Sequence, residues 1–203
     1  MNVQTAPMSP RDLALWQAAK PWLDVRSNDV HTLISWRLAG ALLSLYPDTD
    51  EAIVRPAILL HDTGWKKMPA EKLARAVGPK PEFPELQRDH EIAGVEIGRE
   101  ILSRLNLGLN DGAILGIIDG HDTTKVARSP EDRLVKDADK LWRFTPHGVE
   151  TIGGWFQSPA PDTLAMLEDF VLPSFLSPEA GAMARGFLAE GWARAERDER
   201  MNG

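Results

Sequence analysis

Apolar side chains recur every three or four residues along almost the whole chain, and no stretch alternates apolar and polar residues with a period of two. The segment that starts at Asn28 is the clearest case, because its apolar residues keep this spacing until Pro47. Such spacing places apolar side chains on one face of an α-helix, whereas a half-buried strand requires alternation. The sequence therefore predicts an all-α fold and gives no case for a sheet.

Serine followed by proline marks several predicted helix starts, because serine caps the first turn and proline fits the first helical position. The pairs are Ser9-Pro10, Ser129-Pro130 and Ser177-Pro178. The predicted helices cover about 10–24, 28–46, 50–62, 69–77, 85–106, 110–120, 130–144, 162–172 and 177–200. The stretch 145–161 is rich in glycine and proline and is predicted to be a loop with room for a helical turn. We expect one domain over residues 1–203.

The composition restricts the class of protein. Of 203 residues, 43% are hydrophobic and 26% are charged, which is typical of a folded chain with a core. The net charge of −7 argues against general binding to nucleic acid, which normally requires a basic face. No apolar run approaches the roughly 20 residues that span a membrane, and no basic residue precedes Arg11 as in a signal peptide. We expect a soluble, cytoplasmic protein without a nucleic-acid or membrane partner.

The chain has no cysteine and five histidines, and four of these, His31, His61, His90 and His121, are about 30 residues apart. The lack of cysteine excludes disulfides and thiolate ligands and fits a reducing compartment. An interval of this length holds about one helix and one loop, so each of the four can lie on a different helix facing one core. Imidazoles with nearby carboxylates bind ions such as zinc, iron, manganese and nickel. The spacing therefore predicts a metal site.

The order of these residues resembles the HD-domain superfamily of metal-dependent phosphohydrolases. His31, the doublet His61-Asp62 and the distal Asp137 match its pattern, and His90 and His121 match the further histidines of its dinuclear members. The local sequences Leu-Leu-His-Asp-Thr-Gly (59–64), Asp-His-Glu-Ile-Ala-Gly (89–94) and Asp-Ala-Asp-Lys-Leu (137–141) agree with its motifs. The resemblance covers about residues 28–145 and leaves 146–203 as a C-terminal helical extension.

The resemblance implies a two-metal site. His31, His61 and Asp137 would hold one ion, His90 and His121 the other, and Asp62 would bridge them. Asp139 is the alternative to Asp137, but the family context favours Asp137 and leaves Asp139 to bond nearby backbone. The ions would be one or two of Fe, Mn, Ni, Co, Zn or Mg, and would activate a hydroxide and hold the oxygens of a phosphate.

Other residues are predicted around this site. Lys66 and Lys67 follow the doublet closely and are expected to bind substrate phosphate, and Asp122 is expected to support the imidazoles. Trp65 is expected near the mouth of the site.

Further residues near the motifs have ordinary surface or loop interpretations. Arg133 and Lys136 are weaker candidates for binding phosphate, with pairing on the helix surface as the ordinary interpretation. Glu91 is expected to be a surface or helix-pairing residue. His147 matches no part of the pattern and is expected to be an ordinary loop residue.

Three functions fit this pattern. The first is a phosphohydrolase acting on a small phosphorylated metabolite, possibly a nucleotide, and the motif at 137–141 favours it. The second is a mixed-valence diiron oxygenase, because the superfamily contains such enzymes with the same ligand order. The third is a non-catalytic domain that binds a metal or a nucleotide. The sequence specifies neither the substrate nor the oligomeric state.

Overall fold

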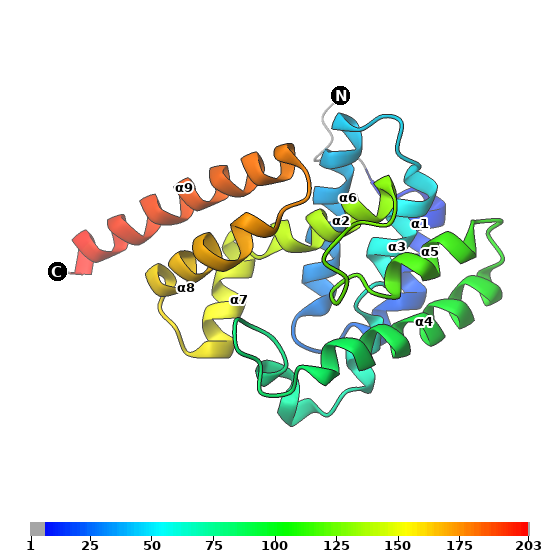
Figure 1. Ribbon diagram of the computed structural model, residues 1–203, viewed down its shortest axis with the longest axis horizontal. Coiled ribbons are helices and arrows are strands. Elements are labelled where there is room, and N and C mark those ends of the chain that lie inside the picture. Colours follow the sequence, from blue (N-terminus) through cyan, green and yellow to red (C-terminus); the bar gives the residue numbers. More distant parts are fainter. Residues whose placement is uncertain (1–6, 203) are drawn as a thin grey trace.

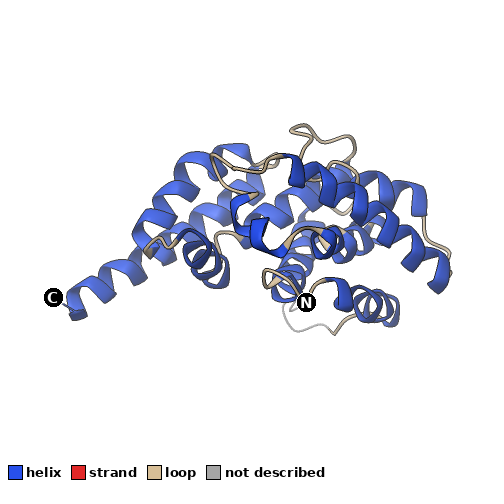
Figure 2. Cartoon of the chain, turned by 90° about the horizontal axis from the view of Figure 1, so that it is seen from below, coloured by secondary structure: helices blue, strands red, loops and turns tan. Residues whose placement is uncertain are grey.

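A computed structural model describes residues 7–202, and within them the chain forms helices joined by loops, with no strand (Figures 1 and 2). The helices are α1 (Pro10–Ala19), η1 (Lys20–Trp22), α2 (Asn28–Leu45), α3 (Glu51–Leu60), η2 (Thr63–Lys67), η3 (Ala70–Arg75), α4 (Glu85–Leu105), α5 (Asp111–Ile118), α6 (Pro130–Trp142), α7 (Pro146–Phe156), α8 (Ala160–Met166), η4 (Leu167–Val171), η5 (Leu172–Ser174) and α9 (Pro178–Asn202). The all-α prediction is confirmed. The prediction that the chain start is not a signal peptide falls partly on residues 1–6, outside the described residues. No described helix combines the length and apolar character needed to cross a membrane.

The predicted helix starts are confirmed where the cap hydroxyl accepts a backbone hydrogen bond. Ser9 Oγ accepts from the amide of Asp12 at 3.1 Å, and Ser129 Oγ accepts from the amide of Asp132 at 3.1 Å. These bonds satisfy amide groups that the first helical turn leaves without an internal partner.

The predicted loop at 145–161 is wrong, because most of it forms α7. Thr145 caps this helix by accepting a hydrogen bond from the amide of Gly148 at 3.2 Å, and Pro146 follows it as the first helical residue. A side chain at Gly148 would place its Cβ 2.1 Å from the carbonyl oxygen of Trp142. At this position glycine permits close packing of α7 against the end of α6, rather than breaking the helix.

The fold brings α2 against α3 and α6, and η2 against α4. One hydrophobic cluster contains buried residues of the central helices, such as Leu42 and Leu134, together with Leu164 of α8 and Leu188 of α9. Each buried leucine contributes about 1.5–3 kcal/mol to stability. The C-terminal helices therefore pack onto the central ones through a shared core, although the far end of α9 extends beyond the rest of the structure (Figures 1 and 2).

The His61-Asp62 doublet is held against α4 by a close backbone approach at Gly64. A Cβ at this position would lie 1.8 Å from the carbonyl oxygen of His90 and 2.6 Å from the amide nitrogen of Gly94. Only glycine leaves room for two backbones at this distance. Gly64 therefore joins the doublet to the helix that carries His90.

Replacing Gly64 with alanine is expected to destabilise the protein by about 1–3 kcal/mol or more, because the new methyl group would overlap backbone atoms that cannot rotate away. Urea denaturation measures the change in the free energy of unfolding. Gly116→Ala in α5 is the control, since no atom lies within 4 Å of its added Cβ. It is expected to change stability by no more than about 1 kcal/mol. Equal stability of the two variants would contradict the close approach.

Candidate metal centre

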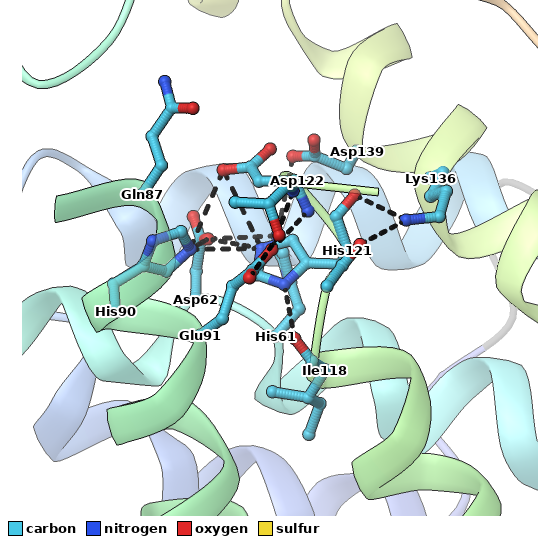
Figure 3. A network of polar contacts seen from close by, with 12 residues as sticks. His61, Asp62, Gln87, His90, Glu91, Ile118, His121, Asp122, Lys136 and Asp139 are labelled. Atoms are coloured by element: carbon cyan, nitrogen blue, oxygen red, sulfur yellow. Dashed lines mark hydrogen bonds and ion pairs between the residues drawn. The ribbon is translucent and has the colours of Figure 1, made fainter. Parts of the chain in front are cut away.

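Six buried side chains from separate parts of the fold meet in one cluster (Figure 3). They are His31 in the first turn of α2, His61 and Asp62 after the end of α3, His90 in α4, His121 after α5, and Asp139 in α6. The sequence predicted the first five of them. The sixth, Asp139, is the residue that the resemblance to the family had ranked behind Asp137.

Hydrogen bonds to backbone carbonyls fix the tautomer of three imidazoles. The Nδ1 atoms of His61, His90 and His121 lie 2.8, 3.3 and 2.9 Å from the carbonyl oxygens of Ile58, Leu86 and Ile118, respectively. A carbonyl oxygen only accepts, so each Nδ1 carries the proton, and the Nε2 atom of the neutral ring has a free lone pair. The three Nε2 lone pairs are thus available to a metal ion.

These Nε2 atoms approach one another in pairs. The Nε2 atoms of His31 and His61 are 3.0 Å apart, and those of His90 and His121 are 3.2 Å apart. Two lone pairs at such distances repel each other unless a proton or a cation is shared between them. Each histidine pair therefore fits a bound cation.

Asp62 lies between the two histidine pairs. Its Oδ2 atom is 3.4 Å from Nε2 of His31, and its Oδ1 atom is 3.6 and 3.5 Å from Nε2 of His61 and His121. Burial acts to raise the pKa of Asp62, but the surrounding imidazoles lower this pKa by more. The net result is a pKa well below the ordinary value of an aspartate. Asp62 is therefore an ionised carboxylate that reaches both histidine pairs, with Oδ2 near His31 and Oδ1 near His61 and the second pair.

The electrostatics of the second pair also indicate a site for positive charge. Burial lowers the pKa of His90 to about 4. Burial also acts to lower the pKa of His121, but a hydrogen bond to Asp62 and the charge of Asp122 raise it to about 10. The carboxylates thus favour a cation at this pair, and a divalent ion would take the place of the proton.

Three overlapping groups in the described chain have ligand atoms within 4.8 Å of one another: His31, His61 and Asp139; His61, Asp62 and His121; His90, His121 and Asp122. Nitrogen and oxygen ligands without sulfur suit ions such as Zn²⁺, Fe²⁺ and Mn²⁺. The residues present thus fit a divalent metal ion.

The expectation that Asp137 is a ligand is corrected by the structure. Its carboxylate accepts hydrogen bonds from the amides of Leu176 and Ser177, both at 2.9 Å, and from the Ser177 hydroxyl at 2.6 Å. Asp139 Oδ1 instead lies 3.2 Å from Nε2 of His31. Residues two apart on a helix point about 200° apart, so only one of the two carboxylates can face the cluster. Asp137 joins α6 to the start of α9.

For Glu91 the structure contradicts surface exposure but supports helix pairing, because its Oε2 lies 2.8 Å from Nη1 of Arg88, three residues earlier on α4. The Glu91 side chain is buried, and Oε1 accepts hydrogen bonds from the amides of Asp122 and Thr123 at 2.9 and 2.8 Å. Its Oε2 accepts from the Thr123 hydroxyl at 2.7 Å. Glu91 therefore fixes the loop that carries His121 and Asp122, and the predicted supporting role of Asp122 is compatible with its place beside the cluster.

Lys136 holds the same loop from the other side. Its Nζ donates to the carbonyl oxygens of Gly120 and His121 at 2.6 and 2.9 Å, and its side chain is buried. It is therefore committed to the protein backbone and is not free to bind phosphate. Arg133 lies over the ring of Tyr46, at 4.9 Å, and does not reach the cluster either.

Lys66 and Lys67 do not face the cluster, which contradicts their predicted role. Lys66 Nζ forms an ion pair with Asp24 at 2.6 Å, and Lys67 Nζ lies 5.1 Å from the ring centroid of Trp22. The tight turn of η2 directs both side chains toward η1, away from the metal ligands. The basic residues at the site are arginines.

Two arginines that the sequence interpretation missed line the cavity beside the cluster, Arg26 and Arg143. Arg143 lies 3.2 Å from Asp139 and 3.8 Å from Asp122. Its position four residues after Asp139, at the C-cap of α6, is a signal that the sequence contained, because residues four apart share a helix face. No comparable signal existed for Arg26, which lies in a loop.

Trp65 lies where the sequence interpretation placed it, whereas His147 lies in α7 rather than in a loop. Trp65 lines the cavity and stacks on His90, with ring centroids 4.0 Å apart and an interplanar angle of 14°. His147 is outside the cluster, and its Nδ1 accepts a hydrogen bond from Nε1 of Trp142 at 3.0 Å.

A cavity of about 360 Å³ opens beside the metal ligands. Its lining includes polar side chains, among them Asp62, Asp122 and Asp139. The lining also includes apolar side chains, largely from the C-terminal helices, with Trp155 and Phe170 among them. The metal ligands therefore face a space in which a small molecule can bind.

A family model for the HD domain matches residues 29–143, which is more than half of the chain. The chain therefore belongs to the HD-domain family, a superfamily of metal-dependent phosphohydrolases that bind divalent metals. The comparison with curated proteins found no match, and the comparison with solved structures found none.

Asp139→Asn is expected to remove most of the bound metal, because an amide is a weaker and uncharged ligand. Asp137→Asn is the matched variant two residues away. It is expected to keep its metal while losing about 1–3 kcal/mol of stability, since it disturbs buried hydrogen bonds to α9. Elemental analysis and urea denaturation of both proteins measure the two effects. Metal loss in Asp137→Asn with full metal in Asp139→Asn would restore the original assignment.

Glu91→Gln is expected to weaken metal binding about tenfold to a hundredfold, because the loop that presents His121 loses its charged anchor. The exposed Glu96 lies on the same helix, and Glu96→Gln is expected to bind metal like the unaltered protein. Titration of the metal-free proteins with Mn²⁺ or Zn²⁺ measures the affinities. Equal affinities for the two variants would show that Glu91 does not position the ligands.

Proposed function

We propose that this protein is a dinuclear phosphohydrolase that releases phosphate from a small phosphomonoester, with nucleotides among the possible substrates. The position of Asp62 is the main support for two ions rather than one. Its Oδ2 faces His31 while its Oδ1 faces His61 and His121. A carboxylate that reaches both histidine pairs suits two cations, because its negative charge would serve an ion at either pair.

The two sets of ligands follow from the same geometry. His31, His61 and Asp139 would hold one ion, and His90, His121 and Asp122 the other. Divalent ions bound there would lower the pKa of a water molecule and offset negative charge on the phosphate oxygens. The carbonyl-bonded Nδ1 atoms orient the imidazoles in advance, so the ligands need little rearrangement on binding.

Arg143 supplies positive charge for the substrate. Burial acts to lower the pKa of Arg143, but the charges of Asp139 and Asp122 raise this pKa by more. The guanidinium therefore stays charged. It lines the cavity beside both carboxylates and is placed to donate hydrogen bonds to phosphate oxygens. This is the role that the sequence interpretation gave to Lys66 and Lys67.

The size of the cavity favours a small substrate. A space of about 360 Å³ holds a phosphorylated metabolite or a mononucleotide and is too small for a polymer. The net charge of −7 also disfavours binding to nucleic acid. We therefore propose a small phosphorylated molecule as the partner.

The proposed activity is tested with metal-free protein reloaded with Mn²⁺, Co²⁺, Ni²⁺, Zn²⁺ or Fe²⁺ and assayed for phosphate release from a panel of phosphomonoesters. Arg143→Met is expected to raise KM about tenfold to a hundredfold, because a charged hydrogen bond to phosphate is lost. Arg194→Met is the control, since Arg194 is exposed and pairs with Glu190 within α9. Its KM is expected to match that of the unaltered protein.

The same preparations separate the other two functions. Substrate-dependent O₂ uptake by the iron-loaded protein, without phosphate release, would contradict hydrolysis and favour the oxygenase. Binding of a phosphorylated ligand without any turnover, for every metal, would favour a non-catalytic domain. Phosphate release that requires the metal and depends on Arg143 supports the proposed function.

A further inference from the structure

Arg26 is an arginine with free donors beside the metal ligands. Its Cζ atom lies 4.3 Å from the ring centroid of Trp65 and 4.4 Å from that of Trp155. Its Nε and Nη1 atoms are buried and have no hydrogen-bond partner among residues 7–202. A guanidinium stacked on aromatic rings keeps its N–H donors along its edge, and these donors remain available here.

A buried cation with unused donors is costly unless a ligand completes its hydrogen bonds. Burial lowers the pKa of Arg26, and the charges of Asp62 and Asp122 act to raise it. Arg143, the other arginine of the cavity, already forms ion pairs with Asp139 and Asp122. Arg26 is therefore the more available group for an anion that enters the cavity.

A second unused donor lies close by in the sequence. The Nδ2 atom of Asn28 is buried without a hydrogen-bond partner among the described residues, and Asn28 lines the same cavity. Arg26 and Ser27 have φ angles of 54° and 59°, in the left-handed region that residues other than glycine seldom adopt. Such strain is common in segments that hold functional groups in place. The loop before α2 thus presents two donors to the cavity in a fixed, unfavourable backbone conformation.

Part of the cavity lining is an apolar wall, which we define as Ile152, Trp155, Phe156, Met166, Leu167, Phe170 and Val171. The wall belongs to α7, α8 and η4, outside the stretch that the HD family model matches. Phe170 is 63% exposed although it is a large aromatic side chain at the rim of a cavity. It lies in η4, a π-helical turn, and such turns are frequent at functional sites. A ligand in the cavity would cover this exposed aromatic surface.

We propose that the cavity binds a phosphomonoester whose organic part is a compact apolar ring, with Arg26 binding the anionic group and the apolar wall packing on the ring. This inference rests on the proposed function and narrows its substrate class. An apolar wall disfavours a sugar phosphate, because the hydroxyl groups of the sugar would lose water without gaining hydrogen bonds. It favours a ring that stacks on or packs against Phe156 and Phe170.

The two halves of this proposal are tested with three ligands that the enzyme cannot hydrolyse. Phenylphosphonate carries both the anion and the ring, methylphosphonate carries the anion alone, and benzyl alcohol carries the ring alone. Calorimetry of the metal-loaded protein measures their dissociation constants. We expect phenylphosphonate to bind at least tenfold more tightly than methylphosphonate, because burial of the ring adds hydrophobic free energy.

Two variants separate the anion site from the ring site. Arg26→Met is expected to weaken both phosphonates about tenfold or more and to leave benzyl alcohol unchanged. Phe170→Ser is expected to reduce the preference for phenylphosphonate several-fold and to leave methylphosphonate unchanged. Arg197→Met and Val126→Ser are the matched controls, since Arg197 pairs with Asp198 on the surface of α9 and Val126 is 72% exposed and does not line the cavity.

The metal content of each variant is measured in parallel, so that a change in affinity is not mistaken for a loss of metal. The proposal is overturned if methylphosphonate binds as tightly as phenylphosphonate, or if Arg26→Met binds both phosphonates like the Arg197→Met control. A third overturning result is a sugar phosphate that is hydrolysed as readily as phenyl phosphate, with a KM that Arg26→Met does not change. In that case the proposed phosphohydrolase function still stands.

The opposite result is also distinguishable. If Arg26 and Phe170 are required for tight binding of phenylphosphonate but no phosphomonoester is hydrolysed with any metal, the proposed function fails. The assignment of the cavity to an anionic ring compound then stands.

Discussion

The structure depends on the convergence of imidazole lone pairs in a buried space. Backbone carbonyls accept hydrogen bonds from Nδ1 of His61, His90 and His121, so the Nε2 atoms point inward. Nitrogen atoms about 3 Å apart repel one another without a shared proton or cation. The buried carboxylate of Asp62 supplies the negative charge that retains such a cation. This arrangement gives the protein its affinity for positive charge, and the other polar groups of the core hold it in place.

Several features of the fold serve that arrangement. Gly64 permits the backbone after the doublet to lie against α4, which brings His61 and His90 into one cluster. Glu91 and Lys136 hold the loop with His121 through hydrogen bonds to its backbone. Burying charged groups is costly, and here the cost is offset because each group satisfies several backbone donors or acceptors. Their contribution is therefore to the position of the ligands as well as to stability.

The cavity lining combines polar side chains of the HD domain with apolar side chains of the helices that follow it. Arg26 contacts both, since it stacks on Trp65 beside His90 and on Trp155 of α7. In the proposed function, the clustered histidines and carboxylates and Arg143 serve the phosphate part of a substrate, while the C-terminal helices contact the remainder of the molecule. This proposal assigns the chemistry to the family's shared motifs and the choice of substrate to the part of the chain outside them.

The sequence by itself determined the all-α fold and most helix starts, because apolar spacing and helix caps are local properties of the sequence. It also pointed to five of the six clustered side chains as ligand candidates. It did not determine which of Asp137 and Asp139 faces the cluster, since that depends on how α6 is rotated against α2 and α9. It also misassigned the stretch 145–161 as a loop, and it did not foresee the burial of Glu91 or the direction of the two lysines after the doublet. The reason is the same in each case. The close packing at Gly148, the burial of Glu91 and the direction of the lysine side chains are set by contacts between segments that are distant in the sequence. Only the tertiary structure decided these, and only it brought Arg26 to the mouth of the site.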